Sequence, residues 1–437
     1  FVHGGSNITG YTADPVYDGA ALARSQGVVV VTVNYRLGIF GFLDAPVLRT
    51  GDPLDDSGNF ALLDIAKALE FVQRDIAAFG GDPGRVTLMG QSAGAVNVYA
   101  LLSSPMLAAR TRPLFHRVVA LSGGISTAAT LPRGAIPGVL PRTVWTTRGQ
   151  ALLSHAMVAD GSAPDAAAAA ALAGHRDGIA NAAYLRGKSA DALLGVVRTR
   201  LGPLGMSAAN PIPDGLVVAT DPIAAIRAGR YVKVPVLAGT TRDETKLFPQ
   251  LLALRPDLGG TSGRLPDDAA VFRLAHGYDP EATPATRIED WVPAAYLPAH
   301  QPGTGFDART RALNRLWFEA IRDDALGALR SRQEAVWCYR FDWDDLPAPF
   351  DAIFGAAHTF DLPFVFGNFG PSLYSRISYT RANEAGRLAL SRAMMDALGA
   401  FAATGDPNAG SPATRWPAWP GKLVFDAEGS RASVRPE

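Results

Sequence analysis

The chain has one cysteine, no excess of either charge and no long apolar run, and each shortage excludes a class of protein. Cys338 is the only cysteine among 437 residues, so no intramolecular disulfide can form, which fits a reducing compartment or a bacterial protein. Lys and Arg total 41 and so do Asp and Glu, so the basic excess of nucleic-acid-binding proteins is lacking. No apolar run reaches the roughly 18 residues that suggest a membrane span. We therefore expect neither a nucleic-acid partner nor a membrane span.

Motifs for metal and phosphate binding are missing as well. Neither H-E-x-x-H nor C-x-x-C occurs, so the sequence predicts no zinc site. The stretch LRGKS, which ends at Ser189, looks like part of a phosphate-binding loop, but such a loop needs a glycine where the chain has Ala182. We expect no metal and no cofactor.

What the chain does contain is material for a large core, because 48% of its residues are hydrophobic and 19% are charged. GVVVVTVNYRLG, residues 27–38, is a continuous β-branched run and predicts a strand buried on both faces. Residues 85–90 and 115–124 predict two further strands, and segments with helical spacing separate the three. This alternation is typical of the α/β class, with a mostly parallel sheet covered by helices on both faces.

The rest of the chain predicts one large domain, residues 1–437, with two helical cap or insertion regions inside it. Residues 126–230 are Ala-rich, and residues 245–334 also have a helical pattern. Strands are expected within 233–244, at 335–343 and at 422–426, and a late helix at 389–408.

The N-terminus differs from that of an ordinary complete chain. The sequence opens on FVHGG without Met, and Phe1 and Val2 look like the end of a strand. We expect the chain to be N-terminally truncated, with the first strands of the sheet and any targeting signal upstream. The sequence therefore assigns no localisation, and both a bacterial cytoplasmic and a secreted or periplasmic place stay open.

Ser92 is the candidate nucleophile. It lies between Gly90 and Gly94, directly after a predicted strand and before a predicted helix. This is the context of a nucleophile elbow, a strained turn that exposes the hydroxyl above a helix N-terminus, where an oxyanion is favoured. The alternative is a chance G-x-S-x-G in a chain with 45 glycines. The flanking strand and helix favour the nucleophile.

A serine nucleophile needs a base and an acid, and in this strand–turn–helix context the chain order is serine, acid, histidine. Of seven histidines, His276, His300 and His358 follow a suitable acidic loop. His358 comes after the predicted strand 335–343, which places it at the carboxyl edge of the sheet, so it is the predicted base. His276 and His300 lie in the predicted helical region.

The acid and the oxyanion hole are less sharply defined. Asp243 and Glu244 are adjacent after a predicted strand, and position does not separate them; either could instead cap a helix. Ala93 would supply one backbone N–H to an oxyanion, and the glycine-rich loop HGGS, residues 3–6, would supply others. Asn7 begins a glycosylation sequon in this loop, where a glycan would be disruptive, so we interpret the sequon as chance.

Taken together, the motifs make the chain resemble the type-B carboxylesterases, the α/β-hydrolase group that includes carboxylesterases and cholinesterases. The resemblance covers essentially the whole chain, and the motifs occur in family order: HGGS, YDGAALA, VVVVTVNYRLGIFGFL, GNFALLDIAKAL, FGGDPGRVTLMGQSAGA, LFHRVVALSGG, PIPDG, VPVLAGTTRDE, HTFDLPFVFG, FAATGDPN and WPAW.

The resemblance implies a site and a reaction. It implies an α/β-hydrolase fold and assigns the triad to Ser92, Glu244 and His358, which settles the choice between the adjacent acids. The implied oxyanion hole consists of the N–H groups of Gly5, Ser6 and Ala93. A second polar layer would involve Gln91, Ser122 and Asp361. The implied activity is hydrolysis of a small-molecule carboxylic ester through an acyl-enzyme, without metal or cofactor.

Three positions depart from the family's usual pattern. Ser6 stands where the family usually has a third glycine, and Gln91 stands where it usually has glutamate, which removes a negative charge beside the nucleophile. Leu247 stands near where a cholinesterase would place an aromatic ring to bind a quaternary ammonium. Two other functions stay open: a non-catalytic binding or adhesion module on the same fold, and a hydrolase of carbamates, amides or lactones.

Overall fold

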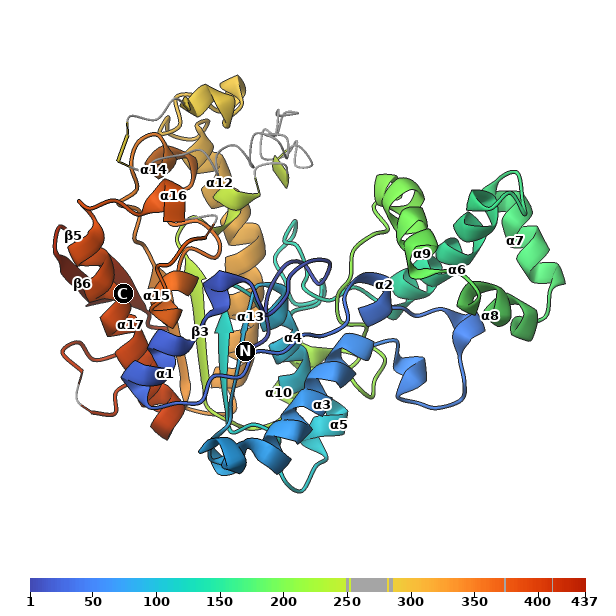
Figure 1. Cartoon of the computed structure of the whole chain (residues 1–437), viewed down its shortest axis with the longest axis horizontal. Helices are drawn as coiled ribbons and strands as arrows, with labels where there is room; N and C mark the ends of the chain where they lie inside the picture. The colour runs from blue at the N-terminus through green and yellow to red at the C-terminus, as the bar shows by residue number, and fades with distance from the viewer. Residues whose placement is uncertain (249–250, 253–280, 283–285, 373–374, 411) are drawn as a thin grey trace.

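A computed structural model describes residues 1–248, 251–252, 281–282, 286–372, 375–410 and 412–437 (Figure 1). In this part of the chain, six strands form one sheet in the order β1-β2-β3-β4-β5-β6. Strands β1 to β5 are parallel, and β6 pairs with β5 in the antiparallel direction. The strands are β1 Thr87–Gln91, β2 Arg117–Leu121, β3 Val236–Thr241, β4 Val336–Phe341, β5 Leu423–Glu428 and β6 Arg431–Pro436.

Alternate residues of the strands face two separate cores, because successive side chains of a strand point to opposite faces. Val118 and Ala120 belong to one core, whereas Val119 and Leu121 belong to the other. On the first face pack α3 (Phe60–Asp75), α4 (Ala93–Leu102), α10 (Pro222–Arg227) and α13 (Ala320–Arg330), among other helices. On the second face pack α1 (Ala20–Gln26), α15 (Leu362–Phe366) and α17 (Glu384–Thr404), among other helices. The helices thus cover both faces of the sheet, as the sequence predicts for the α/β class (Figure 1).

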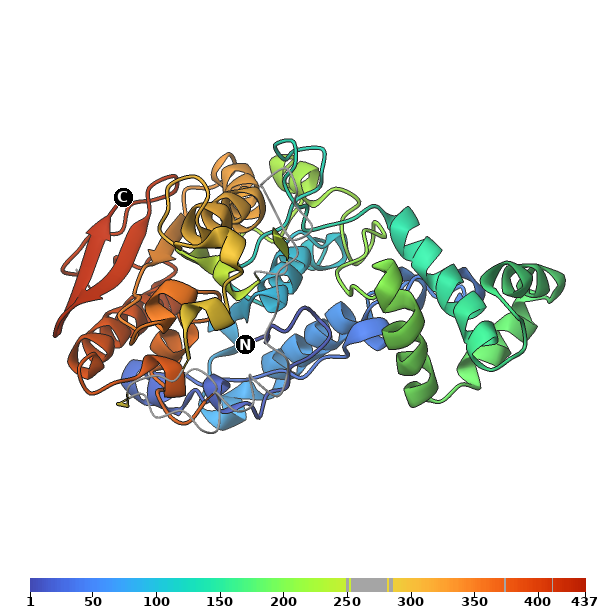
Figure 2. The same ribbon diagram turned by 90° about the horizontal axis from the view of Figure 1, so that it is seen from above.

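A helical lobe extends to one side of this sandwich (Figures 1 and 2). It contains α6 (Arg142–Ala159), α7 (Ala166–His175), α8 (Gly178–Arg186) and α9 (Ala190–Val196). Leu152, Met157 and Leu185 are buried in a hydrophobic core of its own. The remaining described α-helices are α2 (Gly38–Gly41), α5 (Pro105–Ala108), α12 (Phe306–Asn314), α14 (Phe350–Ile353) and α16 (Ser375–Ser378). Part of the second expected helical region, residues 249–250, 253–280 and 283–285, lies outside the described residues.

The predicted strand at residues 27–38 is wrong. This segment is extended but forms only an isolated bridge, between Val33 and Val2, and its valines are half-buried or exposed. The N–H of Val33 donates to Phe1 O over 3.1 Å, and the next residue, Val2, bonds to β1, where its N–H donates to Met89 O over 2.8 Å. Beyond Phe1 and Val2, a cavity of about 390 Å³ separates the segment from β1. A ladder of hydrogen bonds needs a continuous neighbour, which β-branched composition alone does not supply.

The other expected strands and the late helix are present, with shifted ends. Strand β6 was not predicted from the sequence, because its residues are mostly polar or small and none of them is fully buried. It pairs along its whole length with β5 as a hairpin, from Glu428 opposite Arg431 to Leu423 opposite Pro436. Cys338 lies in β4 and is fully buried. Burial raises the pKa of its thiol to about 11.

The first turn of α4 packs directly on the N-terminal residues. A Cβ added to Gly94 would lie 2.1 Å from Val2 O and 2.7 Å from His3 O, both of them rigid backbone atoms. We expect Gly94→Ala to lower the free energy of unfolding by about 3 kcal/mol or more, because overpacking against backbone has no side chain that can move away. Urea unfolding measures this change.

A matched control is Gly327→Ala in α13. A Cβ at Gly327 meets nothing within 4 Å, and the position is exposed. Here the same substitution should stabilise the protein by about 0.5–1 kcal/mol through helix propensity. If Gly94→Ala were as stable as the wild type, the close packing of α4 on residues 2–3 would be wrong.

Candidate active site

The turn between β1 and α4 has the geometry of a nucleophile elbow. Ser92 has φ 55° and ψ −124°, an unfavourable conformation for a residue with a side chain. A hydrogen bond from its N–H to Leu121 O, 2.8 Å long, fixes the turn to the end of β2. A Cβ on Gly90 would lie 2.4 Å from Gly94 O, so the glycine is needed for strand and helix to approach each other. The sequence prediction of a strained serine between glycines agrees with this geometry.

Glu244 and His358 meet at the carboxyl edge of the sheet. Glu244 begins a short 3-10 helix (Glu244–Leu247) after β3, and His358 lies in the loop between α14 and α15. Glu244 Oε2 lies 2.5 Å from His358 Nδ1, and its Oε1 accepts the N–H of Thr241 over 2.8 Å. Both side chains are almost fully buried. A carboxylate on Nδ1 places the proton there and leaves Nε2 as a lone-pair acceptor.

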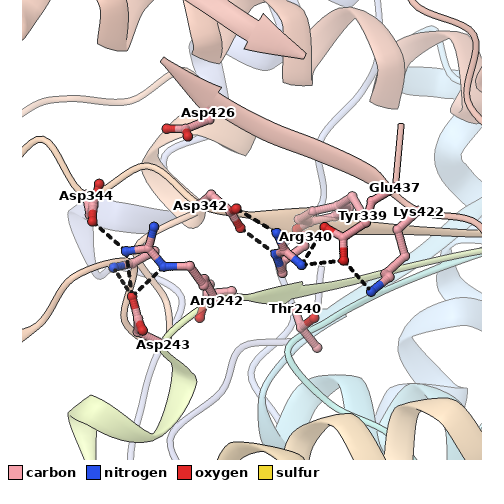
Figure 3. A network of polar contacts seen from close by, with 12 residues as sticks. Thr240, Arg242, Asp243, Tyr339, Arg340, Asp342, Asp344, Lys422, Asp426 and Glu437 are labelled. Atoms are coloured by element: carbon pink, nitrogen blue, oxygen red, sulfur yellow. Dashed lines mark hydrogen bonds and ion pairs between the residues drawn. The ribbon is translucent and has the colours of Figure 1, made fainter. Parts of the chain in front are cut away.

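Asp243 points elsewhere. Its Oδ2 lies 2.8 Å from Arg242 Nη2 and accepts the N–H of Ala356 over 3.1 Å. Arg242 Nη2 also contacts Asp344 at 2.5 Å (Figure 3). Asp243 thereby joins the loop that carries Glu244 to the loop that carries His358. The two adjacent acids, which position in the sequence does not separate, have different contacts: Glu244 orients the imidazole, and Asp243 holds the two loops together.

Gln91 contacts the remaining nitrogen of the imidazole. Gln91 Nε2 lies 3.1 Å from His358 Nε2, and with the proton on Nδ1 the amide is the donor. Gln91 is 1% exposed, and its Oε1 would lie 2.5 Å from a Cβ on Gly4, so its side chain fits between the histidine and the N-terminal loop. Within the described residues, no hydrogen bond joins Ser92 Oγ to His358. The structure therefore brings Gln91, Glu244 and His358 into contact, with Ser92 next to Gln91 in the chain, and it is the amide that contacts Nε2.

The predicted oxyanion loop lies against the elbow. A Cβ on Gly4 would lie 2.9 Å from Ser92 Cβ, so residue 4 packs directly against Ser92. Gly5 and Ser6 follow with φ of 100° and 56°, and both residues are exposed. The N–H groups of Gly5, Ser6 and Ala93 donate to no acceptor in the described part of the chain. This leaves three backbone donors near Ser92 that are not used in secondary structure.

Ser122 and Asp361, predicted in a second polar layer, are both buried next to the site. Asp361 Oδ2 accepts a 2.6 Å hydrogen bond from Tyr339 Oη, while Asp361 Oδ1 and Ser122 Oγ bond to none of the described residues. Burial raises the pKa of Asp361 to about 6, with the charge of Glu244 adding to the rise and the bond from Tyr339 opposing it. Burial, and then the charge of Asp361, raises the pKa of Tyr339 well above its ordinary value, so the phenol stays a donor.

Aromatic rings next to the histidine are the part of the site that the sequence analysis missed. The ring centroids of Phe248 and Phe318 lie 5.2 and 5.0 Å from that of His358. Trp317 packs on both phenylalanines at 5.4 and 4.4 Å. Leu247, the position singled out for its missing ring, is directly followed by Phe248, which was the available signal. Phe318 and Trp317 lie far away in sequence.

The other candidate histidines do not join the site. His300 is 78% exposed in its side chain and lies 2.5 Å from Asp307 Oδ2. His276 falls outside the described residues. Among the residues whose placement is given, no three His, Cys, Asp or Glu side chains gather as a metal site requires. In the same part of the chain, no helix has the length and hydrophobicity to cross a membrane.

Comparisons with known proteins agree on one family. The model of the carboxylesterase family matches residues 1–424. The chain is 30% identical to the para-nitrobenzyl esterase of Bacillus subtilis over 435 residues, covering 98% of this chain and 75% of that protein. It is 31% identical to the fumonisin B1 esterase of Sphingopyxis macrogoltabida, covering 95% of this chain and 66% of that protein. A solved carboxylesterase of Geobacillus stearothermophilus superposes with a TM-score of 0.68 at 28% identity, covering 100% of this chain and 79% of that one.

The raised pKa of Asp361 predicts a pH dependence of stability. The folded state binds this proton more tightly than the unfolded chain, where the carboxyl has its ordinary pKa of 3.8. The stabilisation is therefore fully present below about pH 4 and is lost as the pH rises through about 6. Relative to Asp361→Asn, the wild-type free energy of unfolding should fall by up to about 3 kcal/mol across this window. Chemical unfolding of both proteins at several pH values measures it, and a difference independent of pH would contradict the burial argument.

Proposed function

Because this chain belongs to the carboxylesterase family and is a carboxylic ester hydrolase of the α/β-hydrolase fold, we propose that it works through a triad of Ser92, His358 and Glu244. The observation that carries the proposal is the buried 2.5 Å contact between Glu244 Oε2 and His358 Nδ1, next to a serine in the strained conformation of an elbow. A filled acid–base pair beside a nucleophile disfavours a non-catalytic binding module.

The acylation step follows from the positions of these groups. Ser92 Oγ attacks the ester carbonyl carbon while His358 Nε2 takes the hydroxyl proton. The carbonyl π electrons move to oxygen, and the resulting oxyanion is held by the N–H groups of Gly5, Ser6 and Ala93. Glu244 stabilises the imidazolium through Nδ1. When the intermediate collapses, the C–O bond to the alcohol breaks, and His358 returns the proton to the leaving oxygen.

Deacylation repeats these steps with water. His358 Nε2 removes a proton from water as its oxygen attacks the acyl carbon, and the same backbone donors hold the second oxyanion. Collapse expels Ser92 Oγ, which takes the proton from His358, and the carboxylic acid leaves. The enzyme ends as it began.

In the resting site, the amide of Gln91 contacts the catalytic nitrogen of His358. Its amide donates to the same nitrogen that must receive the serine proton, so proton transfer requires His358 Nε2 to exchange Gln91 for Ser92. The side chain carries no charge, whereas a carboxylate at this position would add electrostatic support for the imidazolium. We propose that Gln91 occupies the acceptor nitrogen of His358 between turnovers.

For the substrate, we propose an uncharged carboxylic ester with an apolar group. Phe248 and Phe318 lie beside His358, and Phe318 is buried whereas Phe248 is half-buried. Such rings favour apolar acyl or alcohol groups by hydrophobic contact. We further propose that the helical regions at 126–230 and 245–334 act as cap segments that shape the acyl and alcohol pockets. Carbamates, amides and lactones use the same machinery, and no contact favours them over esters.

Hydrolysis of p-nitrophenyl esters from acetate to octanoate tests the nucleophile. With the full-length protein, we expect turnover by the wild type and a loss of at least roughly 1000-fold in kcat/KM for Ser92→Ala, because the acyl-enzyme can no longer form. The chain-length profile of the wild type then gives the size of the acyl pocket. Equal activity of Ser92→Ala would place the nucleophile elsewhere, and a folded wild type inert on every ester would favour the binding-module alternative.

The adjacent acids make a second test. Glu244→Gln keeps the shape but not the charge, and we expect kcat to fall on the order of 1000- to 10,000-fold, as when a triad carboxylate becomes an amide. Asp243→Asn is the matched control. It should cost about 1–3 kcal/mol of stability through the contacts with Arg242 and Ala356, while kcat changes less than about tenfold. The reverse order of the two effects on kcat would assign the acid to Asp243.

A further inference from the structure

The loop that supplies two of the proposed oxyanion donors has an unusual backbone conformation, and the contacts of its exposed residues do not account for it. Gly5, Ser6 and Asn7 are consecutive residues with positive φ, of 100°, 56° and 57°. This region is disfavoured for residues with a Cβ, although asparagine tolerates it better than most. The side chain of Ser6 is exposed and bonds to none of the described residues. Something other than Ser6 must hold this conformation.

Asn7 is the buried residue of the loop. Its two neighbours on each side, Gly5, Ser6, Ile8 and Thr9, are exposed, whereas Asn7 is 0% exposed. Its Oδ1 accepts from Asn97 Nδ2 over 2.8 Å, and its Nδ2 donates to Ala209 O over 3.1 Å and lies 3.4 Å from Asn97 Oδ1. The burial also leaves no room for a glycan on the sequon in the folded protein.

Asn97 connects the loop to the nucleophile's helix. It lies in α4, the helix that begins at Ala93, and is also 0% exposed. The two asparagines thus join the segment that carries the N–H groups of Gly5 and Ser6 to the segment that carries the N–H of Ala93. Because an oxyanion hole depends on the relative placement of its donors, this link sets the geometry that the reaction needs.

Two further contacts complete the anchor. Tyr35 Oη lies 3.1 Å from Asn7 Oδ1 and 2.8 Å from His3 O, and burial raises the pKa of this phenol, so it stays protonated as a donor. The N–H of Gly38 donates to Asn7 O over 2.7 Å. With these contacts the side-chain amide and the backbone carbonyl of Asn7 each have hydrogen-bond partners, as buried polar groups require.

We propose that Asn7 and Asn97 form an amide clamp that positions the oxyanion hole. Both are positioning residues, because neither lies on the reacting atoms. Asn7 fixes the left-handed backbone of residues 5–7, and its contact with Asn97 attaches this loop to α4. The proposal rests on the proposed function for its catalytic consequence, whereas its structural consequence is independent of it.

Two variants open the clamp from opposite sides. Asn7→Gly suits the positive φ but removes the amide, so any loss is due to the missing contacts and not to backbone strain. Asn97→Ala leaves the loop sequence unchanged and removes the partner. We expect each to lower kcat for p-nitrophenyl butyrate by roughly 10- to 100-fold, with KM changed less than about twofold, because the oxyanion forms only after binding.

A transition-state analogue separates positioning from general loss of structure. A trifluoromethyl ketone adds to Ser92 Oγ: the Oγ–C bond forms, the carbonyl electrons move to oxygen, and the serine proton goes to His358. Its affinity should fall by the same factor as kcat. The kcat and the analogue affinity of the double variant should be no lower than those of the less active single variant, because the two residues act as one unit.

The matched control is Asn181→Ala in the helical lobe. Asn181 is a buried asparagine in α8 whose Nδ2 donates to Ala173 O over 2.8 Å. Its removal should lower Tm without changing kcat, KM or analogue affinity. If the clamp variants lowered only Tm, as this control does, the asparagines would be structural and the proposal would be overturned.

Amide hydrogen exchange tests the clamp without any ester. The N–H groups of Ile8 and Thr9 donate to Gly5 O, and that of Gly38 donates to Asn7 O. Exchange at these three amides should be at least roughly tenfold faster in both clamp variants and unchanged in Asn181→Ala. Unchanged exchange in both variants would overturn the clamp. A wild type inert on all esters would overturn the proposed function, and exchange would still decide on the clamp. If Asn7→Gly did not fold, Asn97→Ala alone would decide by the same readouts.

Discussion

The site depends on one short contact across the carboxyl edge of the sheet, between Glu244 Oε2 and His358 Nδ1. The two residues are more than a hundred positions apart in sequence and come from loops that follow neighbouring parallel strands, β3 and β4. Parallel strands bring successive carboxyl ends to one edge, which is why such distant residues meet. Asp243 also links the two loops, because it bonds to Arg242 on one side and to the backbone of Ala356 on the other. Glu244, which contacts the imidazole of His358, is therefore adjacent in sequence to Asp243, which links the two loops.

The sequence predicted the parts of this arrangement that depend on local pattern. The elbow at Ser92 could be predicted because two glycines flank the serine, a strand precedes them and a helix follows. The close contacts of Gly90 and Gly94 show why neither position can carry a side chain. The choice between Asp243 and Glu244 was not readable from position, because both side chains lie at the end of the same strand and only the tertiary contacts differ. It came from the resemblance to a family.

Other features depended on partners that no local pattern specifies. Residues 27–38 have the composition of a buried strand, but composition does not supply a continuous neighbour, and the segment bonds mainly to Phe1 and Val2. In contrast, β6 has a weak strand pattern and is held by its hairpin partner β5. The contact between Gln91 and His358 Nε2 and the approach of Phe318 to the same ring are likewise tertiary. At Asn7 the sequence showed only a sequon, whereas burial shows an amide satisfied by three other segments.

The lone thiol in β4 has a practical consequence. Cys338 is the only cysteine of the chain, is fully buried in the middle of the sheet, and has its thiolate disfavoured by burial. Alkylating reagents attack thiolates, so the folded protein offers them almost no target. A single cysteine introduced on the surface can therefore be labelled selectively with a fluorescent or spin probe, because Cys338 does not compete for the reagent in the folded protein. The slow rate of alkylation of Cys338 itself then measures how often the central sheet opens.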